Sequence, residues 1–121
     1  NARALCAHRR NLSDEQATLI AQSGGLIGIT FAGCFIDTKP ENVSIARLVE
    51  HIDHLVSVAG IDHVGIGSDF DGYTDDFGVA MRSCLDLTRL DQALSLKGYG
   101  ADARGKIFGA NWYRVIKAVC G

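Results

Sequence analysis

Two short apolar segments, residues 24–31 and 62–67, constrain the fold more than any other feature of the sequence. The first, GGLIGITF, is an almost unbroken apolar run, which is typical of a strand buried on both faces of a parallel sheet. Between the two segments, residues 44–58 place apolar side chains at helical spacing, and Gly60 ends that helix. A strand, a helix and a second strand in this order predict an α/β fold with parallel strands.

A further helix is predicted before the first strand. Ser13 begins it with an S-x-x-Q capping box, and Gly24 closes it. Ile20 and Ala21 are expected to face the core. Residues 32–43 follow the first strand and read as a loop.

The second strand is followed by a polar loop at residues 71–85 and by helices around 88–97 and 102–119. The last helix is expected to pack its apolar side chains inward: Ile107, Phe108, Trp112, Val115, Ile116 and Val119. Two strands, with a third expected to end at residue 1, leave unpaired edges. The sequence therefore predicts one part of a larger α/β unit.

Composition indicates a globular chain and excludes several classes of function. The 121 residues are 47% hydrophobic and 21% charged, with a net charge of −2. This balance gives no basic surface for nucleic acid, and no apolar run approaches the roughly 18 residues of a membrane helix. The chain has no initiator Met and no signal-peptide pattern, so we expect a piece of a longer protein, which leaves targeting undecided.

Four cysteines lie far apart, without a C-x-x-C pair: Cys6, Cys34, Cys84 and Cys120. This spacing matches neither a zinc motif nor a disulfide framework, and it predicts reduced, mostly buried thiols. It favours a reducing, cytoplasmic location over an oxidising one without deciding the compartment.

The strongest candidate for chemistry is Asp69, in the stretch HVGIGSDFDG. Ligands of parallel α/β sheets and barrels bind at the carboxyl ends of the strands, where Asp69 is expected. Strand alternation places Gly65, Gly67 and Asp69 on one face, which would leave space beneath a carboxylate. We therefore interpret Asp69 as a general acid/base or a neighbour of a metal.

The same stretch allows other interpretations. Asp71-Gly72 is a strong turn signal, and we interpret that pair as a turn. A calcium loop is a weak alternative for DFDGYTDD, because its glycine stands at position four rather than six and no glutamate stands at twelve.

Other charged residues are less specific. Arg9 and Arg10 could hold a carboxylate or phosphate with forked hydrogen bonds, although the residues of HRRN by themselves favour solvated surface arginines. His51 and His54 lie three apart on a helix, a possible metal pair, but the core positions beside them favour the edge of its polar face. His63 begins a strand and is expected to be structural.

Four segments together resemble the membrane (renal) dipeptidase family, peptidase family M19. They are NARALCAHRRNLSDEQ, GGLIGITF, LVEHIDHLVSVAGIDHVGIGSDFDG and IFGANWYRVIKAV. The similarity extends over essentially the whole chain and corresponds to roughly the final third of a family member.

The resemblance implies the C-terminal part of a (β/α)8 TIM barrel of the metal-dependent hydrolase type. It also implies hydrolysis of dipeptides, including those with a C-terminal D-residue, at two zinc ions. By this resemblance Asp69 is catalytic and handles the proton of the attacking water. Arg10 binds the substrate carboxylate, and Phe35 stands where some members place a substrate-contacting tyrosine.

The chain also departs from the family pattern. No position matches the family's zinc ligands, so the sequence predicts no metal ligand here and places the metal-binding N-terminal part outside residues 1–121. The expected partners are a dipeptide, the remainder of the barrel and a second copy in a homodimer, with no nucleic acid. A related metal-dependent amidohydrolase and a catalytically inactive relative remain the alternatives.

Overall fold

Seven regular elements follow one another in the chain, with boundaries close to those expected. The computed structural model describes residues 1–121, apart from the side chain of Asp75. The elements are α1 (Asp14–Gln22), β1 (Ile27–Thr30), α2 (Ile45–Ala59), β2 (Val64–Ser68), α3 (Leu87–Lys97), α4 (Ala101–Gly105) and α5 (Asn111–Cys120). The predicted order is confirmed, except that α4, a π-helical turn at Lys106–Ala110 and α5 together replace the single last helix.

Local capping explains the ends of the first two helices. The Ser13 hydroxyl accepts the Gln16 N–H at 3.3 Å, and the Gln16 side chain accepts the Ser13 N–H at 3.0 Å, which confirms the capping box. Gly60 ends α2 with a φ of +91°, a conformation that favours glycine. In α1 the fully buried residue is Ala17, whereas Ile20 and Ala21 are only half-buried.

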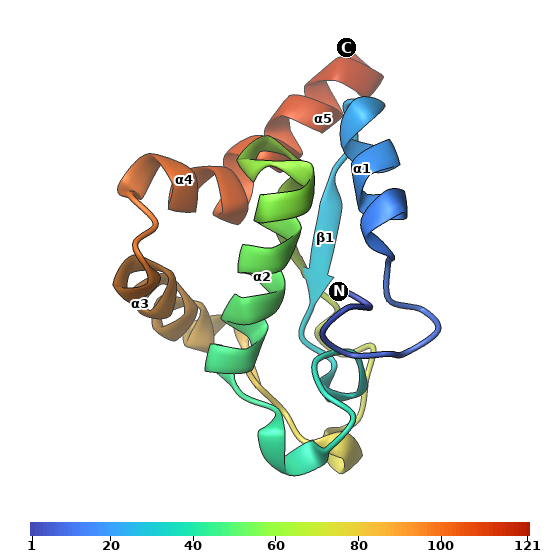
Figure 1. Cartoon of the computed structure of the whole chain (residues 1–121). Coiled ribbons are helices and arrows are strands. Elements are labelled where there is room, and N and C mark those ends of the chain that lie inside the picture. The colour runs from blue at the N-terminus through green and yellow to red at the C-terminus, as the bar shows by residue number, and fades with distance from the viewer.

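β1 and β2 form a two-stranded parallel sheet within the described part of the chain (Figure 1). Ile27 lies opposite Val64 and Ile29 opposite Ile66, and the register then shifts by one residue before Thr30. The third strand expected to end at residue 1 is represented only by an isolated parallel bridge between Ala2 and Leu12.

The core lies on one side of the sheet, where α2 runs alongside β1 (Figure 1). Ile29 and Val64 are fully buried there in one cluster with the apolar stripe of α2, formed by Leu48, Val49, Ile52 and Leu55. On the other side of β1, Gly28 is exposed and Thr30 is half-buried. The expectation of a strand buried on both faces is therefore wrong for β1, because Gly28 and Thr30 on its second face are not buried by the residues that the structure describes.

The glycine face of β2 is less empty than the sequence predicts. A Cβ atom at Gly65 would lie 3.1 Å from Nε1 of the Trp112 indole, and one at Gly28 would lie 3.4 Å from its Cζ2. The indole N–H also donates to the Ile66 carbonyl at 2.7 Å. Trp112 therefore covers the Gly65 and Gly28 positions of this face, and the Gly67 position is closed by the Gly28 backbone, whose carbonyl carbon would lie 2.8 Å from a Cβ there.

Most of the apolar side of α5 faces solvent, contrary to the prediction. Ile107 is fully buried, but Trp112, Ile116 and Val119 are 38%, 55% and 79% exposed. The π-helical turn directs Asn111 inward instead, and its amide donates to the Ile61 carbonyl at 2.7 Å and the Val64 carbonyl at 2.9 Å. An apolar helix side that is exposed to this extent normally marks a surface where another protein segment packs.

The cysteine prediction holds only in part. Cys6 is buried, but Cys84 and Cys120 are exposed, and none of the four forms a disulfide within the described chain. None of the helices that the structure describes is long and apolar enough to span a bilayer.

Candidate active site

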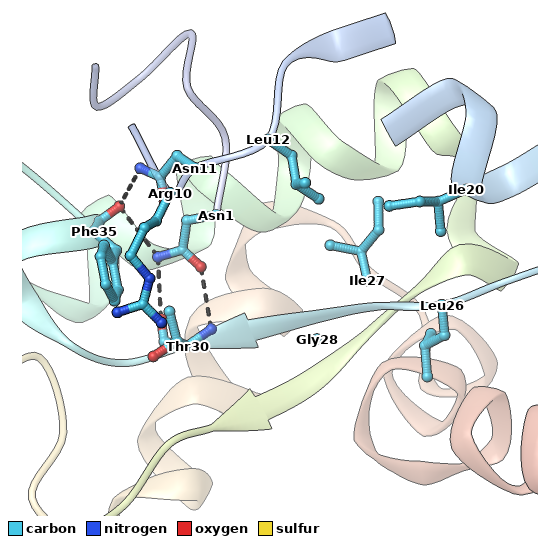
Figure 2. A pocket seen from close by; sticks show the side chains of 10 residues that line it. All are labelled: Asn1, Arg10, Asn11, Leu12, Ile20, Leu26, Ile27, Gly28, Thr30 and Phe35. Atoms are coloured by element: carbon cyan, nitrogen blue, oxygen red, sulfur yellow. Dashed lines mark hydrogen bonds between the residues drawn. The ribbon is translucent and has the colours of Figure 1, made fainter. Parts of the chain in front are cut away.

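A cleft of about 280 Å³ runs along the edge of β1 that faces away from β2 (Figure 2). Arg10 and Phe35, both singled out from the sequence, lie at the end of the cleft next to Thr30. The remaining lining residues are Asn1, Asn11, Leu12, Ile20, Leu26, Ile27 and Gly28. The polar side chains gather with Phe35 at the carboxyl end of β1, and the other apolar side chains line its amino end.

Arg10 presents its guanidinium to the cleft. Its Cζ lies 4.8 Å from the centre of the Phe35 ring, and the His8 ring contacts the same phenyl edge-on at 4.7 Å. A guanidinium over an aromatic face is favourable and keeps its N–H groups available at the edges. Among the described side chains Arg10 has no ion-pair partner, so it is available for an anionic ligand.

The loop that carries Arg10 is held from both sides. The Arg3 guanidinium donates to the carbonyls of Arg9 (3.2 Å) and Asn11 (2.9 Å), the two neighbours of Arg10. The buried Asn11 amide donates to the Phe35 carbonyl at 3.0 Å. Arg10 and Phe35 are therefore fixed relative to each other by hydrogen bonds from the Arg3 and Asn11 side chains to main-chain carbonyls.

Asp69 lies just beyond the carboxyl end of β2, with its side chain exposed. The Thr30 hydroxyl donates to Asp69 Oδ2 at 3.4 Å. Ser68 and Asp69 have φ values of +44° and +66°, a left-handed conformation that is uncommon for residues with a side chain. Such strained residues are concentrated at functional sites, where the surrounding structure holds them.

Asp71 and Gly72 form the turn that the sequence predicts. The Gly72 N–H donates to the Asp69 carbonyl at 3.0 Å, and Asp71 adopts a φ of +65°. The two aspartates of DFDG therefore differ in environment: Asp69 contacts a residue that lines the cleft, whereas Asp71 lies in the turn.

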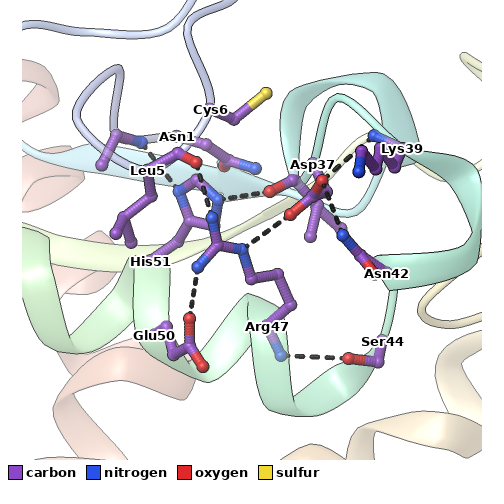
Figure 3. Close-up of polar contacts among 12 residues, drawn as sticks. Asn1, Leu5, Cys6, Asp37, Lys39, Asn42, Ser44, Arg47, Glu50 and His51 are labelled. Atoms are coloured by element: carbon purple, nitrogen blue, oxygen red, sulfur yellow. Dashed lines mark hydrogen bonds and ion pairs between the residues drawn. The ribbon is translucent and has the colours of Figure 1, made fainter.

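A network of polar contacts fixes the N-terminal segment against α2 (Figure 3). Arg47 donates to the Leu5 carbonyl at 2.6 Å, to Asp37 at 3.0 Å and to Glu50 at 2.5 Å. The pKa of Asp37 is lowered, first by the Lys39 backbone N–H and then by other donors that include Arg47. The ionised network stabilises the loops on which Arg10 and Phe35 are placed.

His51 is fully buried, and its expected position at the edge of the polar face of α2 is wrong. Its Nδ1 accepts the Ala2 N–H at 3.1 Å, so Nε2 bears the proton and donates to the Ile36 carbonyl at 2.8 Å. Burial lowers the pKa of His51 to about 4. The neutral ring therefore joins the N-terminal segment to the loop after β1.

We expect this chain to lose stability as the pH falls from about 6.5 to about 4. The pKa of His51 is lower in the folded state than its ordinary 6.5. The unfolded chain therefore binds more protons in this window, and stability rises with pH. The contribution reaches about 3 kcal/mol at most. Melting temperatures across the window for the parent and His51→Gln check this.

The His51→Gln variant should have a shallower dependence of melting temperature on pH, and an unchanged slope would contradict the assignment. A His63→Gln variant controls for the loss of a histidine as such. Burial also lowers the pKa of the Asn1 amine from 8.0 to about 6, so stability begins to fall with falling pH above this window, and this loss is common to the parent and the variants. The pKa of Asp37 lies below its ordinary 3.8, so its stabilising contribution is lost mainly below the window.

The other two predicted histidines have structural partners. His54 Nε2 lies 2.7 Å from Asp14 Oδ1, which joins α2 to α1, and it is half-buried as predicted. His63 Nδ1 lies 2.8 Å from the Gly25 carbonyl. No three His, Cys, Asp or Glu side chains converge on a possible metal position anywhere outside Asp75, whose side chain is not described.

Sequence reasoning missed the polar residues that connect the predicted ones. The Asn1 side chain pairs with both the N–H and the carbonyl of Thr30 at 3.1 Å, as a neighbouring strand would. Asn11 has no motif of its own, and its role depends on contacts distant in sequence. Thr30 had a usable signal, because it ends the first strand just as Asp69 follows the second.

Comparisons with known proteins agree with this geometry. A family model described as membrane dipeptidase (peptidase family M19) matches residues 1–120. An uncharacterized protein in the pqqA 5′ region of Klebsiella pneumoniae is 39% identical over 98% of this chain and 44% of its own length. Dipeptidase tcpJ of Claviceps purpurea is 30% identical over 98% of this chain and 28% of its own length.

A solved structure extends the similarity to three dimensions. It is the metallo peptidase from Rhodobacter sphaeroides with a phosphinate mimic of the dipeptide L-Ala-D-Ala. Its TM-score is 0.85 at 33% identity, over 97% of this chain and 34% of the solved one. The chain thus spans less than half the length of these relatives. Its sequence and its α/β fold with parallel strands show that it belongs to the membrane dipeptidase family, peptidase family M19.

Proposed function

We propose that this chain forms the carboxylate-binding and proton-transfer side of a metallo-dipeptidase active site. One observation supports this most directly: Thr30 lines the cleft next to Arg10, and its hydroxyl contacts Asp69. A cation for the substrate carboxylate and a base for a proton therefore lie at the same end of the sheet. Hydrolysis of a short peptide with a free C-terminus can use the cation to bind the substrate and the base to transfer the proton.

Each residue has a separate role in this proposal. Arg10 binds the C-terminal carboxylate of the dipeptide through two parallel N–H donors, and the Phe35 ring packs against the guanidinium. Water adds to the peptide carbonyl carbon while Asp69 accepts its proton. Asp69 then gives that proton to the amine nitrogen as the C–N bond breaks. The Rhodobacter sphaeroides relative, which holds a mimic of L-Ala-D-Ala, suggests the substrate class.

The two zinc ions implied by the family do not fit the residues of this chain. Catalytic zinc sites use three protein ligands, and no such group is found among the side chains that the structure describes. We therefore propose that the metal ligands belong to protein outside residues 1–121. None of the steps described above requires a metal ligand from this chain.

The same proposal explains two uncovered surfaces. In a strand, alternate residues direct their N–H and carbonyl groups to the same edge. Thr30 uses these groups to pair with Asn1, so those of Gly28 point into the cleft along β1. That cleft and the exposed apolar side of α5 are where the remaining strands and helices of a (β/α)8 barrel would pack.

The complete enzyme is, in this proposal, the present chain joined to a part that supplies the remaining strands and the metal ligands. The N-terminal part of the Rhodobacter sphaeroides peptidase can serve as that part in a chimera, because the chain superposes on 34% of it. A homodimer of the complete enzyme remains a prediction from the family resemblance.

We expect the 121-residue chain alone to bind no stoichiometric zinc and to hydrolyse no L-Ala-D-Ala above background, because it has too few ligands. The complete enzyme should do both. Metal analysis after gel filtration, together with an assay for released D-Ala, compares the two. Turnover by the isolated chain with added zinc would contradict the proposal that the metal ligands lie outside residues 1–121. An inactive complete enzyme would contradict the dipeptidase function.

A related amide hydrolase is the second candidate, and Phe35 is the reason. Its side chain has no hydroxyl group at a position where some family members, by the resemblance, have a substrate-contacting tyrosine. A substrate that needs no hydrogen bond at this point would fit the cleft equally well. Comparing dipeptides with N-acylated amino acids in the same assay distinguishes the two candidates.

A further inference from the structure

Thr30 has a hydroxyl group whose direction is set by its neighbours. The Ala32 N–H donates to Thr30 Oγ1 at 3.3 Å, and the hydroxyl donates its single proton to Asp69 Oδ2 at 3.4 Å. A hydroxyl has one proton to give, and the Ala32 N–H needs an acceptor. The only proton of this hydroxyl is therefore directed at the Asp69 carboxylate.

The position of Thr30 is itself tightly fixed. Asn1 pairs with its backbone N–H and carbonyl, each at 3.1 Å, and the next residue, Phe31, donates to the Ser68 carbonyl at 2.8 Å. The hydroxyl is thus held at a constant place relative to the end of β2. Asp69, by contrast, is exposed and follows the last residue of its strand.

Within the described part of the chain, Thr30 is the only side chain that hydrogen-bonds the Asp69 carboxylate. The other carboxylate oxygen, Oδ1, lies close to Gly72, where a Cβ would be 2.2 Å away, so the turn limits the carboxylate on that side and the Thr30 hydroxyl holds its Oδ2. Thr30 also lines the cleft next to Arg10 and Phe35. It is therefore placed to set the orientation of Asp69 relative to a ligand bound by Arg10.

We propose that Thr30 is a positioning residue, which holds the Asp69 carboxylate in the orientation used for proton transfer. This inference rests on the proposed dipeptidase function and adds Thr30 to the residues predicted from the sequence. Misplacing a proton-transfer group slows the chemical step more than it weakens substrate binding. The expected signature is therefore a lower kcat with a nearly unchanged KM.

The test compares Thr30→Val with Thr30→Ser in the complete enzyme. Valine keeps the shape of threonine but removes the hydroxyl, and we expect kcat for L-Ala-D-Ala to fall about tenfold, the size expected for one hydrogen bond to a charged group. KM should stay within about twofold. Serine keeps the hydroxyl and should restore kcat to within about threefold of the parent. A general structural effect would not be rescued in this way.

A double-mutant cycle with Asp69→Asn separates this inference from the proposed function. If Thr30 acts through Asp69, Thr30→Val should cause no further loss in the Asp69→Asn background. An equal loss in both backgrounds, or a parent-like kcat in Thr30→Val, overturns the positioning role. A parent-like kcat in Asp69→Asn alone overturns the proposed function itself.

A second measurement needs no activity and covers the case in which Thr30→Val does not fold. In the 121-residue chain, three-bond Hα–Hβ couplings report the side-chain conformation of Asp69. One dominant conformer is expected in the parent and in Thr30→Ser, and averaged couplings are expected in Thr30→Ala. Averaged couplings in the parent, or a single conformer in Thr30→Ala, would count against the inference.

Discussion

Replacing Asp69 with asparagine is expected to lower kcat of the complete enzyme for L-Ala-D-Ala by about 10²–10⁴-fold, the usual contribution of a general acid/base. The amide matches the carboxylate in size but neither accepts nor returns a proton. Asparagine also tolerates the left-handed backbone at this position, where φ is +66°. Folding should therefore be preserved, and steady-state kinetics report the chemical step.

Asp71→Asn is the matched control for this substitution. Asp71 has nearly the same backbone conformation, with φ of +65°, and lies two residues further along. We expect its kcat to stay within about twofold of the parent, with equal metal content in all three proteins. Equal losses in the two variants would show that acidity of the loop in general, rather than Asp69, determines the rate.

Replacing Arg10 with methionine should raise KM for L-Ala-D-Ala by about 10²-fold and change kcat little. The expected size is that of losing a charge-assisted, two-pronged contact to a carboxylate. Methionine keeps apolar contact with Phe35, so the loop itself should not move. Steady-state kinetics with saturating substrate separate KM from kcat.

Two controls make the Arg10 result specific. Arg9→Met removes a neighbouring exposed charge that does not line the cleft, and it should leave KM within about twofold. A dipeptide amide, which has no terminal carboxylate, should bind poorly to the parent and should not weaken further in the Arg10 variant. A large additional loss with the amide would mean that Arg10 supports the loop rather than binding the substrate carboxylate.

The parts of the fold that follow local rules could be predicted from the sequence. The capping box at Ser13, the glycine end of α2 at Gly60 and the turn at Asp71-Gly72 depend on residues a few positions apart. The placement of Asp69 after a strand also follows from the chain order, because parallel strands end at the same edge of a sheet. These local signals identify the elements but not their surroundings.

Features that depend on distant contacts could not be predicted. His51 lies among core positions of α2, and only the Ala2 N–H and the Ile36 carbonyl make its burial favourable. Trp112 reads as an ordinary core residue of an amphipathic helix, yet it contacts the glycine face of the sheet. Thr30 and Asp69 are both expected at the carboxyl ends of their strands, but their contact lies where the register of the two strands shifts by one residue, which no local pattern encodes.

The π-helical turn at Lys106–Ala110 has a consequence for how this C-terminal region tolerates changes in length. In an α-helix each residue turns the chain by about 100°. Deleting one residue from the turn would rotate α5 by that angle and withdraw Asn111 and Trp112 from the carbonyls of β2 that they bind. Loops commonly tolerate insertions and deletions, but this turn should not. The number of residues between α4 and the pair Asn111 and Trp112 has to stay constant for both side chains to reach β2.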